Sequence, residues 1–168
     1  EWGHYVAAPY CAKLLADLGA EVIKVEQPDQ GDEARSHGPF PHDEPDKEKS
    51  GLFHLLNANK LGVTLNVASH RGREIMLKLI ARADVLIEDN PPSLLKSYAL
   101  DYDSLEGVNP RLVLTSITPF GHSGPYKDYK GYDINCCALG GVSFAIGDPH
   151  REPLSLPLSQ SHYQAGAN

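Results

Sequence analysis

Four cationic side chains of this sequence lie in segments with the composition of loops. Arg35 ends the run GDEAR, Lys60 ends the turn NANK, and Lys127 and Lys130 flank Tyr129. A guanidinium is a planar, permanently charged fork and an ammonium is a compact point charge, so both groups bind phosphate oxygens. A few such local cations can hold an anionic ligand even in a chain with a negative net charge.

Each of these cations also has a purely structural interpretation. Arg35 can form a surface ion pair with Asp32, and lysines in a loop need no partner besides water. Asn57 and Asn59 can serve only the tight backbone of a turn, which asparagine favours. The residue types alone leave both interpretations open.

The run from residue 9 to residue 35 predicts the elements that position the arginine. Pro9 suits the first position of a helix, whose expected core face carries apolar residues at helical spacing, namely Cys11, Leu14, Leu15 and Leu18. Gly19 can adopt the left-handed conformation that ends the helix, and residues 22–25 form a short buried strand. Helix, glycine turn, strand and the acidic strand end at Glu26 describe half of a nucleotide-binding α/β layer.

Strands and helices continue to alternate along the rest of the chain. The polar segment from residue 27 to residue 50 is expected to be a long functional or dimer-contact loop. Further strands are expected at 61–67, 84–88 and 112–117, and helices after the capping residue Ser69, at 91–98, at 103–108 and at 133–139. This alternation predicts a mainly parallel sheet with flanking helices.

The composition fits part of a globular enzyme and excludes two kinds of partner. A chain of 168 residues with 41% hydrophobic residues can bury one core. A formal net charge of −7 argues against a nucleic-acid binder, and no run of about 18 apolar residues predicts a membrane span. The three cysteines do not have the spacing of a zinc site, so we expect no metal; they are Cys11, Cys136 and Cys137. We expect them to be buried free thiols in a reducing, cytoplasmic location.

The order of several motifs resembles a known family. The runs LLADLGAEVIKVEQP, LNANKLGVTLN, ARADVLIEDN, NPRLVLTSITPFGHSGPY and KGYDINCCALGG follow one another as in the family III CoA-transferases. That family contains formyl-CoA transferase and carnitine CoA-transferase, with α-methylacyl-CoA racemase as a relative. The resemblance implies a Rossmann-like α/β fold. It also implies that residues 1–168 are the incomplete N-terminal part of the large domain, without the small domain and the C-terminal return.

The resemblance further implies a site for coenzyme A, bound as the acyl-CoA substrate. The residues before the first helix line the family's CoA channel, and the GDxxR arginine contacts phosphate. The positions that match the family's site, or replace its residues, are Val6, Ala7, Arg35, Asn57, Asn59, Lys60, Asp89, Asn90, Lys130 and Tyr132. Asp89-Asn90 stands where relatives usually have Asn-Phe. A histidine works as an acid/base at the position of Tyr132 in the racemase, so racemisation by that pair of residues is not expected here.

The catalytic position of the family is altered in this chain. The transferases attack the thioester with an aspartate that lies four residues before a glycine. In the matching segment LPLSQSHYQAG, His162 lies four residues before Gly166, and no Asp or Glu occurs from residue 153 to residue 168. The resemblance makes His162 the candidate base or nucleophile. The alternative is a partly buried histidine that is hydrogen-bonded in the channel wall.

Two functions stay open at this point. One is an enzyme that moves CoA between an acyl-CoA thioester and a free carboxylic acid through a covalent intermediate. The other is a catalytically degenerate CoA- or acyl-CoA-binding half or module that works with a second, aspartate-bearing domain. The resemblance implies an interlocked homodimer, or a tandem or heteromeric partner, and neither nucleic acid nor membrane is an expected partner.

Overall fold

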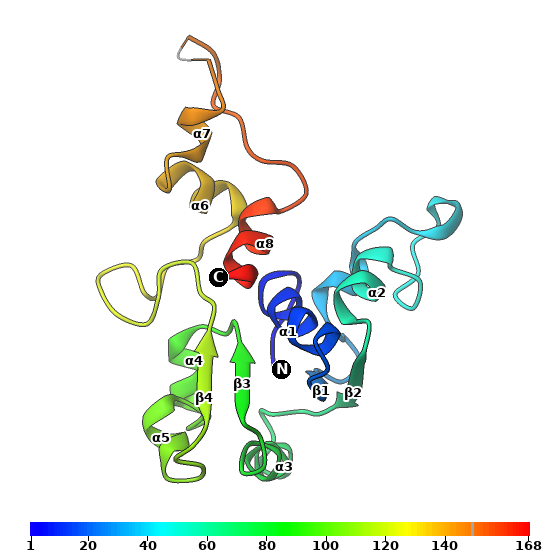
Figure 1. The fold of residues 1–168 in the computed structure, drawn as a ribbon, viewed down its shortest axis with the longest axis vertical. Coiled ribbons are helices and arrows are strands. Elements are labelled where there is room, and N and C mark those ends of the chain that lie inside the picture. The colour runs from blue at the N-terminus through cyan, green and yellow to red at the C-terminus, as the bar shows by residue number, and fades with distance from the viewer. Residues whose placement is uncertain (149) are drawn as a thin grey trace.

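Four short parallel strands form the centre of the computed structural model, which describes residues 1–148 and 150–168. Strand β1 (Val22–Glu26) pairs with β2 (Lys60–Thr64), and β3 (Val85–Glu88) pairs with β4 (Val113–Ser116). Residues 1 and 2 lie between the two pairs: the N–H of Val25 donates to Glu1 O at 2.9 Å, and the N–H of Trp2 donates to Ile87 O at 2.8 Å. The strand pairs are thereby joined in the order β2, β1, residues 1–2, β3, β4 (Figure 1). The predicted parallel α/β fold is confirmed.

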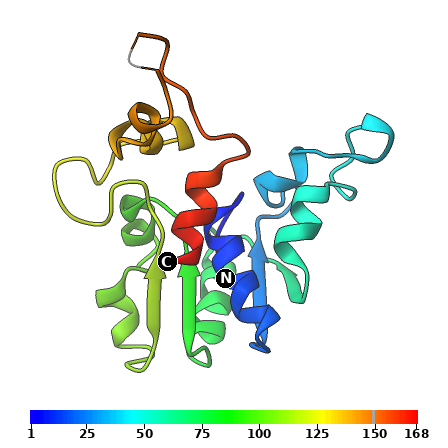
Figure 2. The same cartoon turned by 45° about the horizontal axis from the view of Figure 1, so that its top comes forward.

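Helices surround these strands, and the last helix returns to the first. In chain order the helices and short 3-10 turns are α1 (Ala7–Asp17), η1 (Glu33–Ser36), η2 (Pro41–Asp43), α2 (Gly51–Asn57), α3 (His70–Ile80), α4 (Pro92–Ser97), α5 (Tyr102–Glu106), α6 (Asp133–Leu139), α7 (Val142–Ala145) and α8 (Gln160–Ala167). Helices α6 and α7 extend away from the strands (Figure 1). Figure 2 shows α8 coming back from them to stand beside α1, which it contacts.

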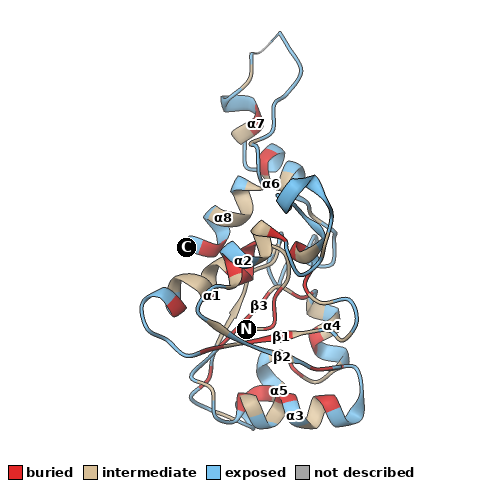
Figure 3. Ribbon diagram, turned by 90° about the vertical axis from the view of Figure 1, so that its right-hand side faces the viewer, coloured by how far each residue is buried: buried red, intermediate tan, exposed pale blue. Residues whose placement is uncertain are grey.

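Two apolar clusters hold the strands and helices together. The larger lies between the strands and helices α3, α4 and α5, and it includes Met76, Leu95 and Leu105. In Figure 3 the buried residues concentrate in β1 and β3 and on the inner sides of these helices, whereas the described residues of the loop after α7 are mostly exposed. Ser69 begins α3 as predicted, because its Oγ accepts the N–H of Gly72 at 3.0 Å.

The smaller cluster corrects the predicted core face of the first helix. Helix α1 turns Ala8, Ala12 and Ala16 toward the strands, whereas Leu18 is 86% exposed. Because alanine side chains are small, the helix axis can come close to β1 and β3. The favourable close packing of this helix outweighs the larger free energy that burying the leucines would give. The expected end of the helix is confirmed, since Gly19 has φ of +100°.

Three findings concern the cysteines, membrane-spanning helices and metal sites. All three cysteines are free thiols, as predicted, but only Cys137 is buried, whereas Cys11 and Cys136 are half-buried. Within residues 1–148 and 150–168, no helix is both long and apolar enough to cross a membrane. The same residues contain no group of three or more His, Cys, Asp or Glu side chains that could hold a metal ion.

Candidate functional site

The turn that precedes α1 has an unusual backbone conformation at Tyr5. Its φ of +60° lies in the left-handed region, which a bulky residue rarely occupies without a compensating contact. Asp32 supplies that contact, because its Oδ1 accepts the N–H of Tyr5 at 2.9 Å and the N–H of Ala34 at 2.7 Å. The loop that follows β1 therefore holds the turn before α1 in place.

Helix α8 packs on this same end of α1. A Cβ atom at Gly166 would lie 2.4 Å from Ala7 O, so only glycine permits this approach. The Tyr10 and Tyr163 rings meet edge to face with centroids 5.0 Å apart, which adds a second contact between the two helices. The residues predicted at the family's channel and at its catalytic position are thus brought together.

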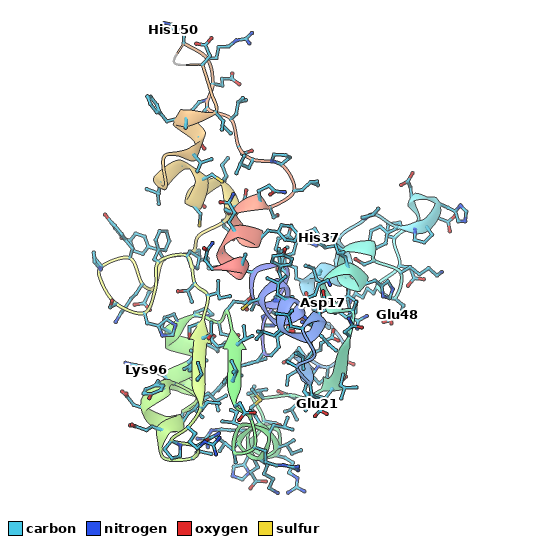
Figure 4. All side chains as sticks on the ribbon, in the orientation of Figure 1. Asp17, Glu21, His37, Glu48, Lys96 and His150 are labelled. Carbon is cyan, nitrogen blue, oxygen red and sulfur yellow. The ribbon has the colours of Figure 1, made fainter. Side chains whose placement is uncertain are left out.

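His162 lies next to Tyr5 as a result of this packing. The two rings meet edge to face at a centroid distance of 5.6 Å, and Tyr5 Oη is hydrogen-bonded to Ser159 Oγ at 2.9 Å. The ring centroids of His37 and Tyr5 lie 4.9 Å apart, and Figure 4 labels His37 beside α8 and α2. His162 is half-buried, and among the described residues its ring nitrogens have no hydrogen-bond partner. The role of His162 therefore stays a prediction.

The predicted channel residues Val6 and Ala7 contribute backbone rather than side chains. Both side chains are buried, at 1% and 8% exposure. Val6 is the N-cap residue of α1 and no side chain caps the helix there. Any ligand contact at these two positions is made by backbone atoms at the amino-terminal end of α1, where N–H groups attract anions.

His4, which directly precedes Tyr5, forms a pair with Asp89. Both oxygens of Asp89 accept the N–H of His4 at 3.0 Å, and His4 Nδ1 lies 3.3 Å from Asp89 Oδ1. The hydrogen bond to Asp89 raises the pKa of His4, against the opposing effect of burial. The next residue, Asn90, is buried and donates to Trp2 O at 2.9 Å, so its side chain serves the sheet.

Arg35 lies at the opposite side of the β1 loop and is partly engaged. Its Nε and Nη2 donate to the two oxygens of Glu26 at 2.7 and 3.0 Å, and its guanidinium lies 3.6 Å from the Phe53 ring centroid. The structural alternative named Asp32 as the partner, but Glu26 is the partner found. Nη1 donates to Lys47 O at 3.5 Å and to Glu48 Oε1 at 3.3 Å. All three guanidinium nitrogens therefore have acceptors, and the Nη1 edge is the one that an anion could reach by displacing the exposed Glu48 side chain.

Lys60 is part of a buried ion network rather than a surface loop. Its Nζ donates to Glu1 at 2.6 Å, to Pro9 O at 2.7 Å and to Asn57 Oδ1 at 2.9 Å. Burial lowers the pKa of Lys60, against the opposing attraction of Glu1. This position does not support a phosphate contact by Lys60, and it gives Asn57 a structural partner.

A second buried lysine completes that network. Lys24 Nζ lies 2.8 Å from Glu1 Oε1 and 2.6 Å from Asp32 Oδ2, and all three side chains are almost fully enclosed. Burial opposes its charge, but the two carboxylates outweigh burial and raise the pKa of Lys24. Because Asp32 also holds Tyr5, the network ties the position of the turn before α1 to the interior of the sheet.

The remaining predicted residues lie outside this cluster. Asn59 donates to Asp17 Oδ1 at 2.8 Å, at the far end of α1. Lys130 is exposed, and Tyr132 is 66% exposed at the start of α6, with its N–H donating to Asn135 Oδ1 at 3.0 Å. Both lie on the long loop between β4 and α6, so a ligand could contact them only from the surface.

A cavity of about 310 Å³ opens between this loop and helices α4 and α5. Its basic lining residues are Lys96, His122 and Lys127, together with three aspartates on the same walls. Figure 4 shows Lys96 on α4, away from the labelled His37 and Glu48. Sequence reasoning named Lys127 among the candidate cations, but it did not predict that Lys127 shares a cavity with Lys96.

One carboxylate near His162 was missed by sequence reasoning. Asp133, the first residue of α6, accepts the N–H of Ser161 at 3.0 Å and also the hydroxyl of Ser161. Ser161 directly precedes His162, so an acid from α6 lies beside a segment that has none of its own. Only the packing of α6 against α8 reveals this, because the two residues are 28 positions apart.

Comparison with known proteins agrees with this arrangement. The family model described as CoA-transferase family III matches residues 1–168. The chain belongs to that family. A solved structure of a CaiB/BaiF family protein from Brucella suis, a family III homologue at 37% identity, superposes with a TM-score of 0.88 over 99% of this chain and 44% of its own.

Two relatives of the CoA-transferase family have assigned reactions. Succinate–glutarate CoA-transferase from Agrobacterium fabrum is 36% identical over 95% of this chain and 40% of its own length. The BbsE subunit of succinyl-CoA:(R)-benzylsuccinate CoA-transferase from Thauera aromatica is 39% identical over 95% of this chain and 38% of its own length. The chain thus spans about two fifths of the length of these CoA-transferases.

Proposed function

We propose that the protein to which this chain belongs moves CoA from an acyl-CoA thioester to a free carboxylic acid. The observation that carries the proposal is the packing of α8 on α1, which places His162 5.6 Å from Tyr5 at the turn before α1. Membership of CoA-transferase family III supports the same reaction. The predicted thioester-binding backbone and the predicted catalytic position thus share one surface.

CoA would occupy the surface between this turn and the loop after β4. The Nη1 edge of Arg35 binds the phosphates of CoA, and the backbone of Val6 and Ala7 contacts the arm of CoA. Asp89 lies in the channel wall beside His4. Lys130 and Tyr132 approach from the loop, near the cavity that holds Lys96 and Lys127. Phosphate needs only a few such local cations despite the chain's net negative charge.

In the catalytic route, His162 serves as the nucleophile. Its neutral imidazole attacks the thioester carbonyl, the C–S bond breaks, and CoA leaves as a thiolate. The acceptor carboxylate displaces the imidazole to give an anhydride, and the thiolate attacks the acceptor carbonyl to release the first acid. A carboxylate route through Asp133 is the alternative that its position beside Ser161 supports.

Acyl exchange by the full-length protein tests the function. Isotope-labelled succinate or glutarate is incubated with a panel of acyl-CoAs that includes succinyl-CoA, and label is followed into the thioester. Succinyl-CoA is the first donor because several relatives are named for succinyl-CoA or succinate. We expect His162→Ala to abolish exchange and the exposed control His70→Ala to preserve it. Loss with Asp133→Asn but not His162→Ala would assign the nucleophile to α6.

Binding without exchange for any donor and acceptor pair would instead support the non-catalytic CoA-binding module. Calorimetry with CoA separates these outcomes, because the transferase and the module both bind CoA. Absence of CoA binding by the full-length protein would contradict both functions.

We further propose that the active protein is an interlocked homodimer or a heteromer in the cytoplasm. Large apolar side chains on α1, α6, α7 and the loop before α8 are exposed, including Leu18, Leu139, Phe144 and Leu158. Such surfaces mark contacts with further protein. BbsE is named as a subunit, which makes a heteromer the alternative, and free thiols favour a reducing compartment. Size-exclusion chromatography with light scattering of the full-length protein tests the assembly.

A further inference from the structure

We propose that the His4–Asp89 pair gives this protein a second activity, the hydrolysis of acyl-CoA to free acid and CoA thiol. The inference rests on the proposed binding of acyl-CoA, but not on the transfer reaction. It uses a pair of side chains that the transfer route leaves idle.

The geometry of the pair is that of an oriented general base. Both oxygens of Asp89 accept the backbone N–H of His4 at 3.0 Å, and Asp89 Oδ1 lies 3.3 Å from His4 Nδ1. A carboxylate on Nδ1 fixes the tautomer in which Nε2 carries the lone pair. Among the described residues Nε2 has no partner, and the His4 side chain is 41% exposed. A water molecule can therefore reach it.

His4 is close in the chain to the residues that are proposed to bind the acyl-CoA thioester. His4 directly precedes Tyr5, whose ring contacts His162, and it lies two residues before the backbone proposed to meet the CoA arm. Segment 153–168 carries no carboxylate to trap the acyl group. A thioester bound there would face an oriented imidazole and water, which are the components of a hydrolytic site.

The reaction balances with water as the only co-reactant. His4 Nε2 takes one proton from water as the hydroxide oxygen bonds to the thioester carbonyl carbon. The tetrahedral intermediate expels the sulfur as the C–S bond breaks, and the imidazolium returns the proton to the thiolate. The products are the carboxylic acid and CoA thiol, and neutral His4 is regenerated.

The pH profile gives the pair a signature that a structural role would not produce. Only neutral His4 can accept a proton, so the hydrolysis rate rises with pH through the pKa of His4. The groups that set this pKa are Asp89 after β3, Asp32 before η1 and Lys24 in β1; the carboxylates raise it and the lysine lowers it. Asp89→Asn removes the largest raising contribution, so the midpoint moves to lower pH.

The test measures thiol release from succinyl-CoA by the full-length protein without any acceptor acid, across pH. We expect release above the uncatalysed background, a loss of about 100-fold in His4→Gln, and a lowered pH midpoint in Asp89→Asn. His70→Gln, on the exposed surface of α3, is the matched control and keeps the rate.

Calorimetry with CoA on each variant, and thermal unfolding, complete the test. Exchange without thiol release, or release that His4→Gln leaves unchanged at unchanged CoA affinity, overturns hydrolysis by this pair while leaving the transferase intact. Failure of the unmodified protein to bind CoA overturns the hydrolysis and the proposed function together.

Discussion

Asp32 holds Tyr5 in a left-handed backbone conformation through a 2.9 Å hydrogen bond from the N–H of Tyr5 to Asp32 Oδ1. The other oxygen of Asp32 is paired with the buried Lys24 at 2.6 Å. One carboxylate therefore connects the ion network inside the sheet to the residue that contacts His162. The site depends on that carboxylate although Asp32 itself does not face the ligand surface.

We expect Asp32→Ala to lower the free energy of unfolding by about 3–5 kcal/mol, because it leaves a buried lysine short of a partner. Asp32→Asn should cost less, since its amide oxygen can still accept the N–H of Tyr5. Denaturant titration of both variants measures the difference. Equal losses would show that the charge, and not the hydrogen bond to Tyr5, is what matters.

The pair of Glu26 and Arg35 predicts a pH dependence of stability. Burial favours the neutral carboxyl, but hydrogen bonds from Arg35 and from the N–H of Asp32 outweigh it, so the pKa of Glu26 is lowered. A lowered folded-state pKa adds stability above the unfolded value of about 4.3, and this stability is lost as pH falls through the folded-state pKa.

Glu26→Gln should therefore lower the free energy of unfolding by about 1–3 kcal/mol at pH 7, with a smaller effect below about pH 4. Glu33→Gln, an exposed change on η1, is the control and should have little effect at any pH. Urea titrations at several pH values provide the measurement. A penalty that is as large at low pH as at pH 7 would refute the ionic explanation.

Arg35 yields a prediction about ligand recognition. Because Nη1 makes the longest contacts of the guanidinium, we expect Arg35→Ala to weaken binding of CoA more than binding of dephospho-CoA. Glu48→Gln should strengthen CoA binding by removing a competing carboxylate. Calorimetry on the full-length protein, with Arg71→Ala on α3 as control, checks both. Equal losses of affinity for the two ligands would show that Arg35 does not contact the 3′-phosphate of CoA.

Gly166 predicts that the docking of α8 is sensitive to one methyl group. A Cβ there meets the backbone oxygen of Ala7 at 2.4 Å, so Gly166→Ala should displace α8 and reduce acyl exchange at least tenfold. Gly107→Ala, where the nearest atom is 4.0 Å away, is the matched control. Hydrogen exchange of α8 in both variants would show whether the helix has moved; an undisturbed α8 in Gly166→Ala would contradict the packing argument.

The sequence determined the order of elements and the family. Apolar periodicity, Gly19 and the Ser69 cap each act within a few residues, so they predict β1, the end of α1 and the start of α3 without knowledge of the fold. Motif order likewise placed the chain in its family and pointed to His162. Local signals failed in part for α1, where Leu15 and Leu18 are exposed and alanines face the strands.

The tertiary structure decided which charged side chains belong to the site. Lys60 and Arg35 are both cations in polar segments, yet Lys60 is enclosed by Glu1 and Pro9 while Nη1 of Arg35 faces the exposed Glu48 side chain. The partners of His4 and Ser161 lie 85 and 28 positions away in the chain. Burial and pairing depend on such long-range contacts, and spacing along one sequence carries no record of them.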